Sequence, residues 1–234
     1  TSGTLTIAAG STTGTFNVPV LADTTDENNE TATITLSSPT NASISDSTAT
    51  LTITDDDAAP SLSIADVTAG NENAANHTFT VSLSAASGKD ITVDYATSNG
   101  TATAGADYTA TSGTLTISAG ATSGTFNVPV LADSTDENNE TATITLSNAS
   151  NASISDSTAT LTITDDDASP TLSFFDSNNS YTYQITEQDG SKTLDIRLSA
   201  ASAKTITVNY ATDTTDSFPT FTSSTIVSNV TDAE

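Results

Sequence analysis

The chain has 234 residues, and its 29 acidic and 4 basic side chains give a formal net charge of −25. A surface this negative repels nucleic acid and anionic membranes and attracts cations. The absence of cysteine excludes disulfides and thiolate metal sites, and no apolar run approaches the roughly 20 residues that span a bilayer.

A stretch of 59 residues occurs twice in the sequence. Residues 2–60 match residues 112–170 at 51 positions, with an offset of 110. A repeat of this length is a whole domain rather than a solenoid unit. The sequence therefore predicts that residues 1–60 are the second half of one repeat, that residues 61–170 form a complete repeat, and that residues 171–234 are the first part of a divergent third repeat.

In the complete repeat, apolar and polar residues alternate with a period of two, which predicts half-buried β-strands. In chain order, the inward-facing positions are Leu62 and Ile64; Phe79, Val81 and Leu83; Ile91, Val93 and Tyr95; Leu115 and Ile117; Phe126, Val128 and Val130; Ala142, Ile144 and Leu146; Ala159, Leu161 and Ile163. Seven short strands in about 100 residues are typical of an immunoglobulin-like sandwich. We therefore expect an all-β protein of tandem seven-strand sandwiches, with almost no helix.

Two single residues carry expectations of their own. Pro129 lies inside a predicted strand, as Pro19 does in the first copy. Proline cannot donate a ladder hydrogen bond, so we expect this strand at a sheet edge or a bulge.

The one histidine, His77, stands at a strand start, and we expect it on the surface. A Ser-His-Asp site would depend on it alone, so we predict that the protein is not an enzyme.

The acidic side chains of the complete repeat gather in loops, whereas the outward strand faces carry Thr and Ser. One loop holds Asp133, Asp136, Glu137 and Glu140, and three aspartates end the last strand at 165–167. In a sandwich such loops can converge at one end. Unit charges 4 Å apart repel by ~1 kcal/mol even in water, and we expect no basic neighbours to relieve this repulsion.

A hard divalent cation would relieve it. Calcium accepts about six to eight oxygen ligands in a flexible geometry, whereas magnesium keeps more water. Zinc is disfavoured because the chain has no cysteine and one histidine. The alternative is a solvated acidic rim that keeps the protein soluble.

Four segments together resemble a Calx-beta domain: 100–108 (GTATAGADY), Ser112-Gly113-Thr114-Leu115, the acidic loop ending in Glu140-Thr141, and 163–167 (ITDDD). The whole of 61–170 fits, and the flanking halves fit less completely. The resemblance implies a seven-strand immunoglobulin-like sandwich that binds several calcium ions at one end.

By this resemblance, eight acids of the complete repeat fall where family ligands lie. They are Glu72, Asp107, Asp133, Glu137, Glu140, Asp165, Asp166 and Asp167. The matching acids of the first copy are Asp23, Glu27, Glu30, Asp55, Asp56 and Asp57. Ala132, Asn138 and Asn139 stand where calcium-sensing members often have acids, which implies fewer or weaker ions. No Ala-Gly-x-Asp-Tyr element occurs in the third repeat, so no calcium site is expected there.

These features predict a calcium-binding structural repeat region of a bacterial adhesin or surface fibre, located outside the cell or at its surface. Calcium at the exit aspartates would rigidify the domains and the linkers at Pro60 and Pro170. The alternative is a filament subunit that polymerises head to tail by complementation of its half-repeats, although cutting a longer repeat protein produces the same half-repeats. An intracellular calcium sensor fits the nearly base-free, cysteine-free composition poorly.

Overall fold

The computed structural model describes residues 1–72, 76–175 and 186–211. The chain divides into two compact units, Thr1–Lys204 and Thr205–Glu234. In the second unit, residues 205–211 are described and contain no strand. Among the described residues, no helix has both the length and the apolar character of a membrane span. The part of the third repeat beyond residue 211 lies outside the described residues.

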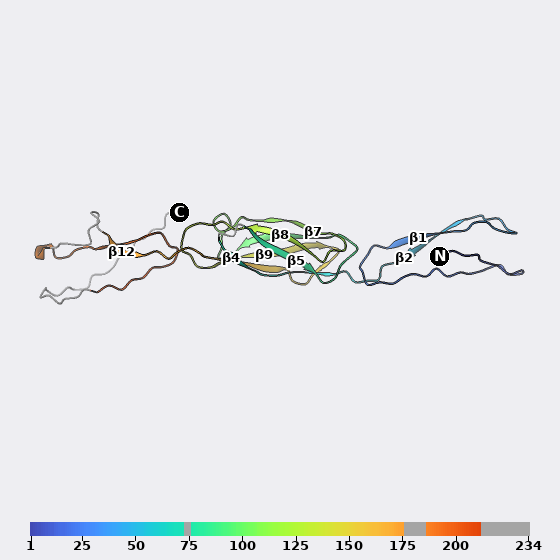
Figure 1. The fold of residues 1–234 in the computed structure, drawn as a ribbon, viewed down its shortest axis with the longest axis horizontal. Helices are drawn as coiled ribbons and strands as arrows, with labels where there is room; N and C mark the ends of the chain where they lie inside the picture. Colours follow the sequence, from blue (N-terminus) through green and yellow to red (C-terminus); the bar gives the residue numbers. More distant parts are fainter. Residues whose placement is uncertain (73–75, 176–185, 212–234) are drawn as a thin grey trace. The chain divides into compact units, whose positions relative to one another are not determined.

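The complete repeat is a β-sandwich of two sheets (Figure 1). The first sheet has the order β10-β3-β5-β8 and the second the order β4-β11-β9-β6-β7. The strands are β3 (Ser61–Ile64), β4 (Val67–Asn71), β5 (Asn76–Leu83), β6 (Ile91–Asn99), β7 (Ser112–Ile117), β8 (Ser123–Pro129), β9 (Glu140–Ser150), β10 (Ser153–Ile154) and β11 (Thr158–Thr164).

All seven predicted strands are present, and two short ones are added. The chain leaves the first sheet after β3 and enters the second as β4, which pairs in parallel with β11. The two-residue β10 pairs in parallel with β3. The edge position predicted for the strand with Pro129 is confirmed, because β8 ends the first sheet and Pro129 is its last residue.

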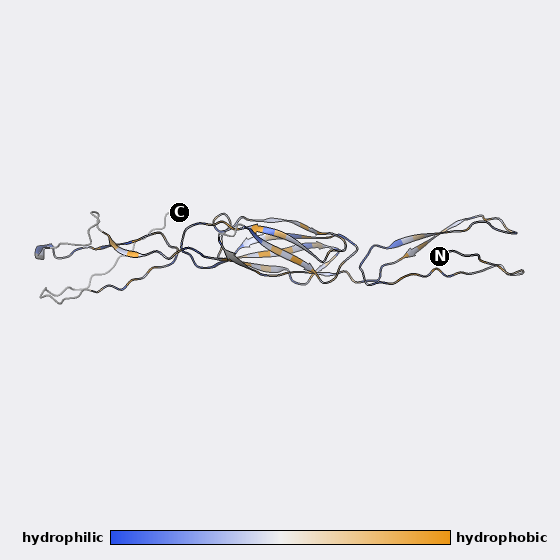
Figure 2. Ribbon diagram, in the orientation of Figure 1, coloured by the Kyte–Doolittle hydropathy of each residue, from blue (hydrophilic) through white to orange (hydrophobic). Residues whose placement is uncertain are grey.

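The core lies between the two sheets and is formed by the alternating residues that the sequence pattern indicated. Phe79, Ile91, Ile144 and Leu161 are at most 1% exposed. Apolar residues recur along the strands of this sandwich in Figure 2. Burying each large apolar side chain contributes about 1.5–3 kcal/mol. The sandwich therefore holds its end loops on a packed scaffold.

The expectation that His77 lies on the surface is wrong. His77 is 5% exposed and lies in β5 opposite Val128, on the same inward face as Phe79 and Val81. Its Nε2 atom is buried without a hydrogen-bond partner. Burial lowers the pKa of this imidazole, which keeps the neutral form in the core.

The flanking repeats contain fewer strands. In the first copy, β1 (Glu30–Thr35) pairs with β2 (Thr48–Ile53). In the third repeat, β12 (Leu172–Phe175) pairs with β13 (Asp195–Leu198), and a single 3-10 turn, η1, spans Glu187–Asp189. This turn is the one helical segment among the described residues, as expected from the sequence.

Candidate metal centre

The first acidic element is the turn between β6 and β7 that carries Asp107. Gly105 has φ +95°, a left-handed conformation that glycine adopts without strain, and the Asp107 carboxylate accepts a hydrogen bond from the Thr103 amide at 2.6 Å. The next residue, Tyr108, is 1% exposed and donates its hydroxyl to the Asn99 side chain at 2.7 Å. A buried aromatic anchor therefore positions Asp107.

The second element is the acidic loop between β8 and β9. Its first carboxylate, Asp133, accepts a hydrogen bond from the Thr135 amide at 2.6 Å, which forms a local Asx turn. The loop ends where β9 begins at Glu140, and the next amide, Thr141, donates to the Thr101 hydroxyl at 2.8 Å. The loop is thus fixed at its two ends by different contacts.

The third element is the exit of β11. Asp165, Asp166 and Asp167 follow the last strand residue directly. The Thr164 carbonyl accepts a hydrogen bond from the Glu72 amide at 3.2 Å, which brings Glu72 next to the aspartates. The Asp165 carboxylate accepts from the Asp167 amide at 3.3 Å. Four segments that are distant in the sequence therefore meet at one end of the sandwich.

The structure brings six of the eight predicted acids together in two triads. In each triad, one carboxylate oxygen of every member lies within 4.8 Å of the others. The first triad is Glu72, Asp133 and Asp167, and the second is Asp107, Glu137 and Glu140. The Asp167 Oδ2 atom is buried and has no hydrogen-bond partner. An unpaired buried carboxylate oxygen is costly, so this all-oxygen donor set fits a hard cation.

The pKa values show how unfavourable the uncompensated triads are. Burial, followed by the negative charges of Asp133 and Glu137, raises the pKa of Glu72 from 4.5 to about 7. Burial, followed by a hydrogen bond to Asp107, raises the pKa of Glu140 to about 7 as well. Burial is also the main reason that the pKa of Asp167 is raised. Without a cation, these carboxyl groups therefore stay protonated up to a higher pH than isolated carboxyl groups do.

The other two predicted ligands lie outside the triads. Asp165 Oδ2 accepts a hydrogen bond from Lys204 Nζ at 2.9 Å. Asp166 is exposed and belongs to neither triad. The expectation that the acidic loops have no basic neighbours is therefore wrong, because a lysine from the third repeat reaches Asp165.

Sequence reasoning missed the most buried acid of this loop, Asp136, which is 2% exposed. It accepts hydrogen bonds from Lys204 Nζ at 2.7 Å and from the hydroxyls of Ser202 and Ser169. The first two of these bonds lower the pKa of Asp136 despite its burial. The signal in the sequence was Ser-x-Lys at Ser87–Lys89 and again at Ser202–Lys204, in a chain with four bases.

The matching acids of the first copy lie differently. Within the described residues, Asp23, Glu27, Glu30, Asp55, Asp56 and Asp57 form no triad of this kind. Glu27 still lies near like charges, since the charge of Asp23, followed by burial, raises its pKa. Asp55 instead lies 3.5 Å from Lys89 Nζ. No counterparts of Glu72 or Asp107 lie beside this copy in the described residues.

Comparisons with known proteins find one family model and several solved structures that are similar to the chain. The family model described as "Calx-beta domain" matches residues 1–57, 55–167 and 165–217. Among solved structures, the apo-form Calx CBD1 domain is 26% identical, covering 46% of this chain and 98% of that one, with a TM-score of 0.43.

A second similar structure is "calcium binding domain CBD12 of CALX1.1". The two chains are 28% identical over a match that covers 50% of this chain and 50% of the solved one, with a TM-score of 0.44. No curated protein matches the chain at a significant level.

Proposed function

The chain belongs to the Calx-beta family, and from this premise we propose that its complete repeat binds Ca²⁺ at the acidic end of the sandwich. The observation that carries the proposal is the pair of carboxylate triads, one of which contains the buried, unpartnered Asp167 Oδ2. Hard oxygen donors in flexible loops suit calcium better than zinc or magnesium.

The six triad residues would hold the ions: Glu72, Asp133 and Asp167 in one group, and Asp107, Glu137 and Glu140 in the other. A bound cation supplies the positive charge that these carboxylates lack. The residues themselves contribute positions fixed by β9, β11 and the Tyr108 anchor. Because the loops come from separate strands, joining them through one ion would stabilise the folded sandwich against the unfolded chain.

We also propose that this region is part of a bacterial adhesin or surface fibre outside the cell, and that calcium rigidifies its domains and their linkers. The near-identity of two repeats supports a structural role, because a fibre gains from copies of one module. The position of the aspartates supports it too, since Asp167 and Asp57 precede the linker prolines Pro170 and Pro60 by three residues. Extracellular modules commonly bind calcium at ~10⁻⁴–10⁻³ M, which suits constant occupancy there.

Calorimetric titration of the full chain with Ca²⁺ tests the binding. We expect heat of binding, and a melting temperature that rises with calcium and falls with chelator. Asp133→Asn and Asp107→Asn, which each alter one triad, should each reduce the binding. The exposed Asp46→Asn, which removes the same charge elsewhere, should not. Absence of binding by the wild type contradicts the proposal. Small-angle scattering tests rigidity: an unchanged maximum dimension and melting temperature after chelation contradict the bracing role.

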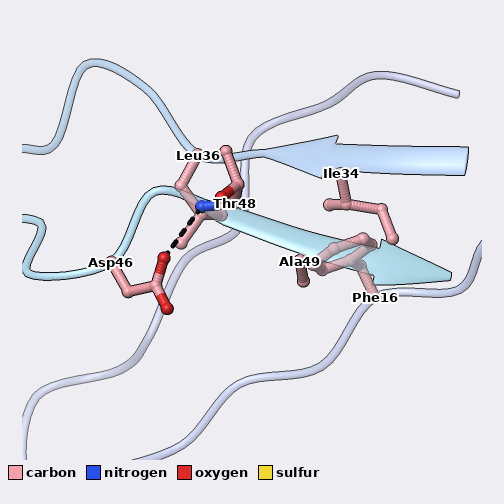
Figure 3. A pocket seen from close by; sticks show the side chains of 6 residues that line it. All are labelled: Phe16, Ile34, Leu36, Asp46, Thr48 and Ala49. Carbon is pink, nitrogen blue, oxygen red and sulfur yellow. Dashed lines mark hydrogen bonds between the residues drawn. The ribbon is translucent and has the colours of Figure 1, made fainter.

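A groove in the first copy favours a second candidate function, the head-to-tail filament. Phe16, Ile34, Leu36, Asp46, Thr48 and Ala49 line a cavity of about 250 Å³, shown in Figure 3. In the complete repeat, the residues matching Phe16 and Ile34 are buried under the early strands. Strands β12 (Leu172–Phe175) and β13 (Asp195–Leu198) of a second copy would cover the groove. Concentration-dependent fibres in electron microscopy, lost in Phe16→Asp, are the expected result; a monomer at all concentrations contradicts it.

A further inference from the structure

Two contacts between neighbouring repeats use the same residue types in the same arrangement. Between the second and third repeats, Ser202 Oγ donates to Asp136 Oδ2 at 2.8 Å, and Lys204 Nζ donates to Asp136 Oδ1 at 2.7 Å. Between the first and second, Ser87 Oγ and Lys89 Nζ make the same two bonds to Asp26, also at 2.8 and 2.7 Å.

The backbone takes part in both contacts. The Asp136 carbonyl accepts a hydrogen bond from the Ala203 amide at 3.0 Å, and the Asp26 carbonyl accepts one from the Gly88 amide at 2.8 Å. A three-residue loop therefore binds the carbonyl and both carboxylate oxygens of one aspartate. Asp136 is 2% and Asp26 5% exposed. Carboxylates buried this deeply require such partners.

Each lysine also reaches a second acid of the preceding repeat. Lys204 Nζ lies 2.9 Å from Asp165 Oδ2, and Lys89 Nζ lies 3.5 Å from Asp55 Oδ2. The lysine thus connects the acidic loop of the preceding repeat to the exit of its last strand. Since both acids are at most 14% exposed in their side chains, water screens these pairs less than it screens a surface ion pair.

The arrangement persists where the surrounding sequence changes. The acceptors recur at an offset of 110, whereas the donor loop recurs at an offset of 115 because the third repeat is longer before β13. The two contacts differ at one position. Ser169 donates a hydrogen bond to Asp136 at 3.1 Å, whereas the matching residue of the first copy is Ala59, which has no hydroxyl to donate.

We propose that Asp136 and Asp165 are a docking site for the Ser202–Lys204 loop of the following repeat, and that this latch joins consecutive repeats without a metal ion. The partner is a repeat of the same chain. Asp136 lies in the loop between Asp133 and Glu137, yet it belongs to neither carboxylate triad. The acidic loop therefore has two roles: Asp133, Glu137 and Glu140 belong to the triads, whereas Asp136 binds the next repeat. The inference goes beyond calcium binding and does not depend on it.

Distance measurements between spin labels on the full chain test the latch. The chain has no cysteine, so cysteines introduced at the exposed Thr125 in β8 and Ser173 in β12 give a single label pair across the contact. We expect a narrow distance distribution for the otherwise wild-type protein in chelator, and a further narrowing when calcium braces the linker. In chelator, Lys204→Ala should lose the narrow peak, because the bonds to Asp136 and Asp165 are removed together.

Matched variants separate the latch from general effects of charge. Lys192→Ala removes an exposed lysine of the same repeat and should leave the peak unchanged. Lys204→Arg should retain it, and Ser169→Ala, which copies the first contact, should retain it as well. If Lys204→Ala does not fold, its circular dichroism spectrum will lack the β-sheet signal. In that case Ser202→Ala provides the test: it removes only the hydroxyl hydrogen bonds and should broaden the distance peak.

Two outcomes overturn the latch. One is a Lys204→Ala distribution identical to that of the wild type. The other is a wild-type distribution that loses its narrow peak in chelator alone, which would mean that metal ions hold the contact. Neither outcome bears on the calorimetric titration, so the latch and the calcium site fail independently.

Discussion

Residues 1–57 and the matching part of the complete repeat have nearly the same sequence but different structures. Phe16 is 52% exposed and Phe126 is 7% exposed; Ile7 is 51% exposed and Ile117 is 1% exposed. The complete repeat forms β7 and β8, whereas the first copy has no strand at the matching positions. The cause lies in the partners, because β7 pairs with β6 and β8 with β5.

The turns, by contrast, are the same in both copies. Asn41 and Asn151 both have φ 59°, and Gly10 and Gly120 have φ 86° and 82°. A Cβ atom added at Gly14 or at Gly124 would lie 3.0 Å from the Cγ1 atom of an isoleucine in each copy. The comparison teaches that local sequence determines turns here, whereas the sheets require strands from the other half of the repeat.

Replacing the central aromatic of each copy should give the largest difference. Phe126 stacks with Tyr95 at 3.9 Å and with Phe79 at 5.6 Å between ring centroids. Phe126→Ala should lower the free energy of unfolding by about 3–5 kcal/mol. Phe16→Ala should change it by less than about 0.5 kcal/mol, as surface substitutions do. Thermal unfolding of the full chain measures both, and equal losses would show that the first copy is closed over Phe16.

Removing one carboxylate from each copy should separate their calcium affinities. Glu140→Gln alters a triad and should remove much of the stabilisation by calcium, which reaches ~4 kcal/mol at 1,000 times the dissociation constant. Glu30→Gln, the matching change, should leave it unchanged because Glu30 belongs to no triad in the described residues. Melting temperatures over a calcium series provide the measurement. If Glu30→Gln reduces the calcium-dependent rise in melting temperature as much as Glu140→Gln does, the two copies bind calcium alike.

The pH dependence of the calcium-free protein should sharpen the comparison further. The folded-state pKa of Glu72 is about 7, above its ordinary 4.5, so the folded protein binds more protons between these values. Its stabilising contribution is full below pH 4.5 and is lost as the pH rises through 7. In chelator, the wild type should therefore lose more stability than Glu72→Gln between pH 5 and 8.

The histidine in the core acts in the opposite direction. The lowered pKa of His77 makes folding less favourable as the pH falls below 6.5. The wild type and Glu72→Gln must therefore be compared at each pH. Because both proteins contain His77, its effect on stability cancels in the difference between them. Identical pH profiles for the wild type and Glu72→Gln would contradict the assigned burial of Glu72. Calcium should reverse the trend, because it binds the deprotonated carboxylates.

The smallest difference concerns the turn asparagines. Asn151 Nδ2 donates to the Asp90 carbonyl at 2.9 Å, whereas no such bond is present for Asn41 among the described contacts. Glycine adopts a positive φ without strain, so Asn→Gly isolates the hydrogen bond. Asn151→Gly should cost about 0.5–1.5 kcal/mol and Asn41→Gly less; chemical denaturation measures both. Equal costs would assign the effect to the backbone instead.

Much of the fold could be predicted from the sequence. The alternation at Phe79, Val81 and Leu83 located β5. In the structure His77 continues the same inward parity, whereas its position at the strand start had suggested the surface. The strand β4, in contrast, carries no clear alternation in Val67–Asn71 and forms by pairing with β11. The absence of strands at residues 2–19 of the first copy could not be predicted from alternation, because this segment has the same pattern as β7 and β8.

The candidate site divides in a similar way. The resemblance located the acids that form the triads, since loop length and strand order bring them to one end. It did not distinguish Asp165, which pairs with Lys204 across 39 residues of sequence. Contacts between separate repeats depend on how the repeats dock, and a periodicity within one repeat carries no information about that.

The spacing of Asp136 and Ser202 has a genetic consequence. The complete repeat carries both a donor Ser-x-Lys, at Ser87–Lys89, and an acceptor aspartate, Asp136, which contact the repeats before and after it. An unequal crossover that inserts or deletes one period of 110 residues would therefore restore a matched pair at every seam. The length of such a polypeptide could drift between lineages while each joint remained chemically the same.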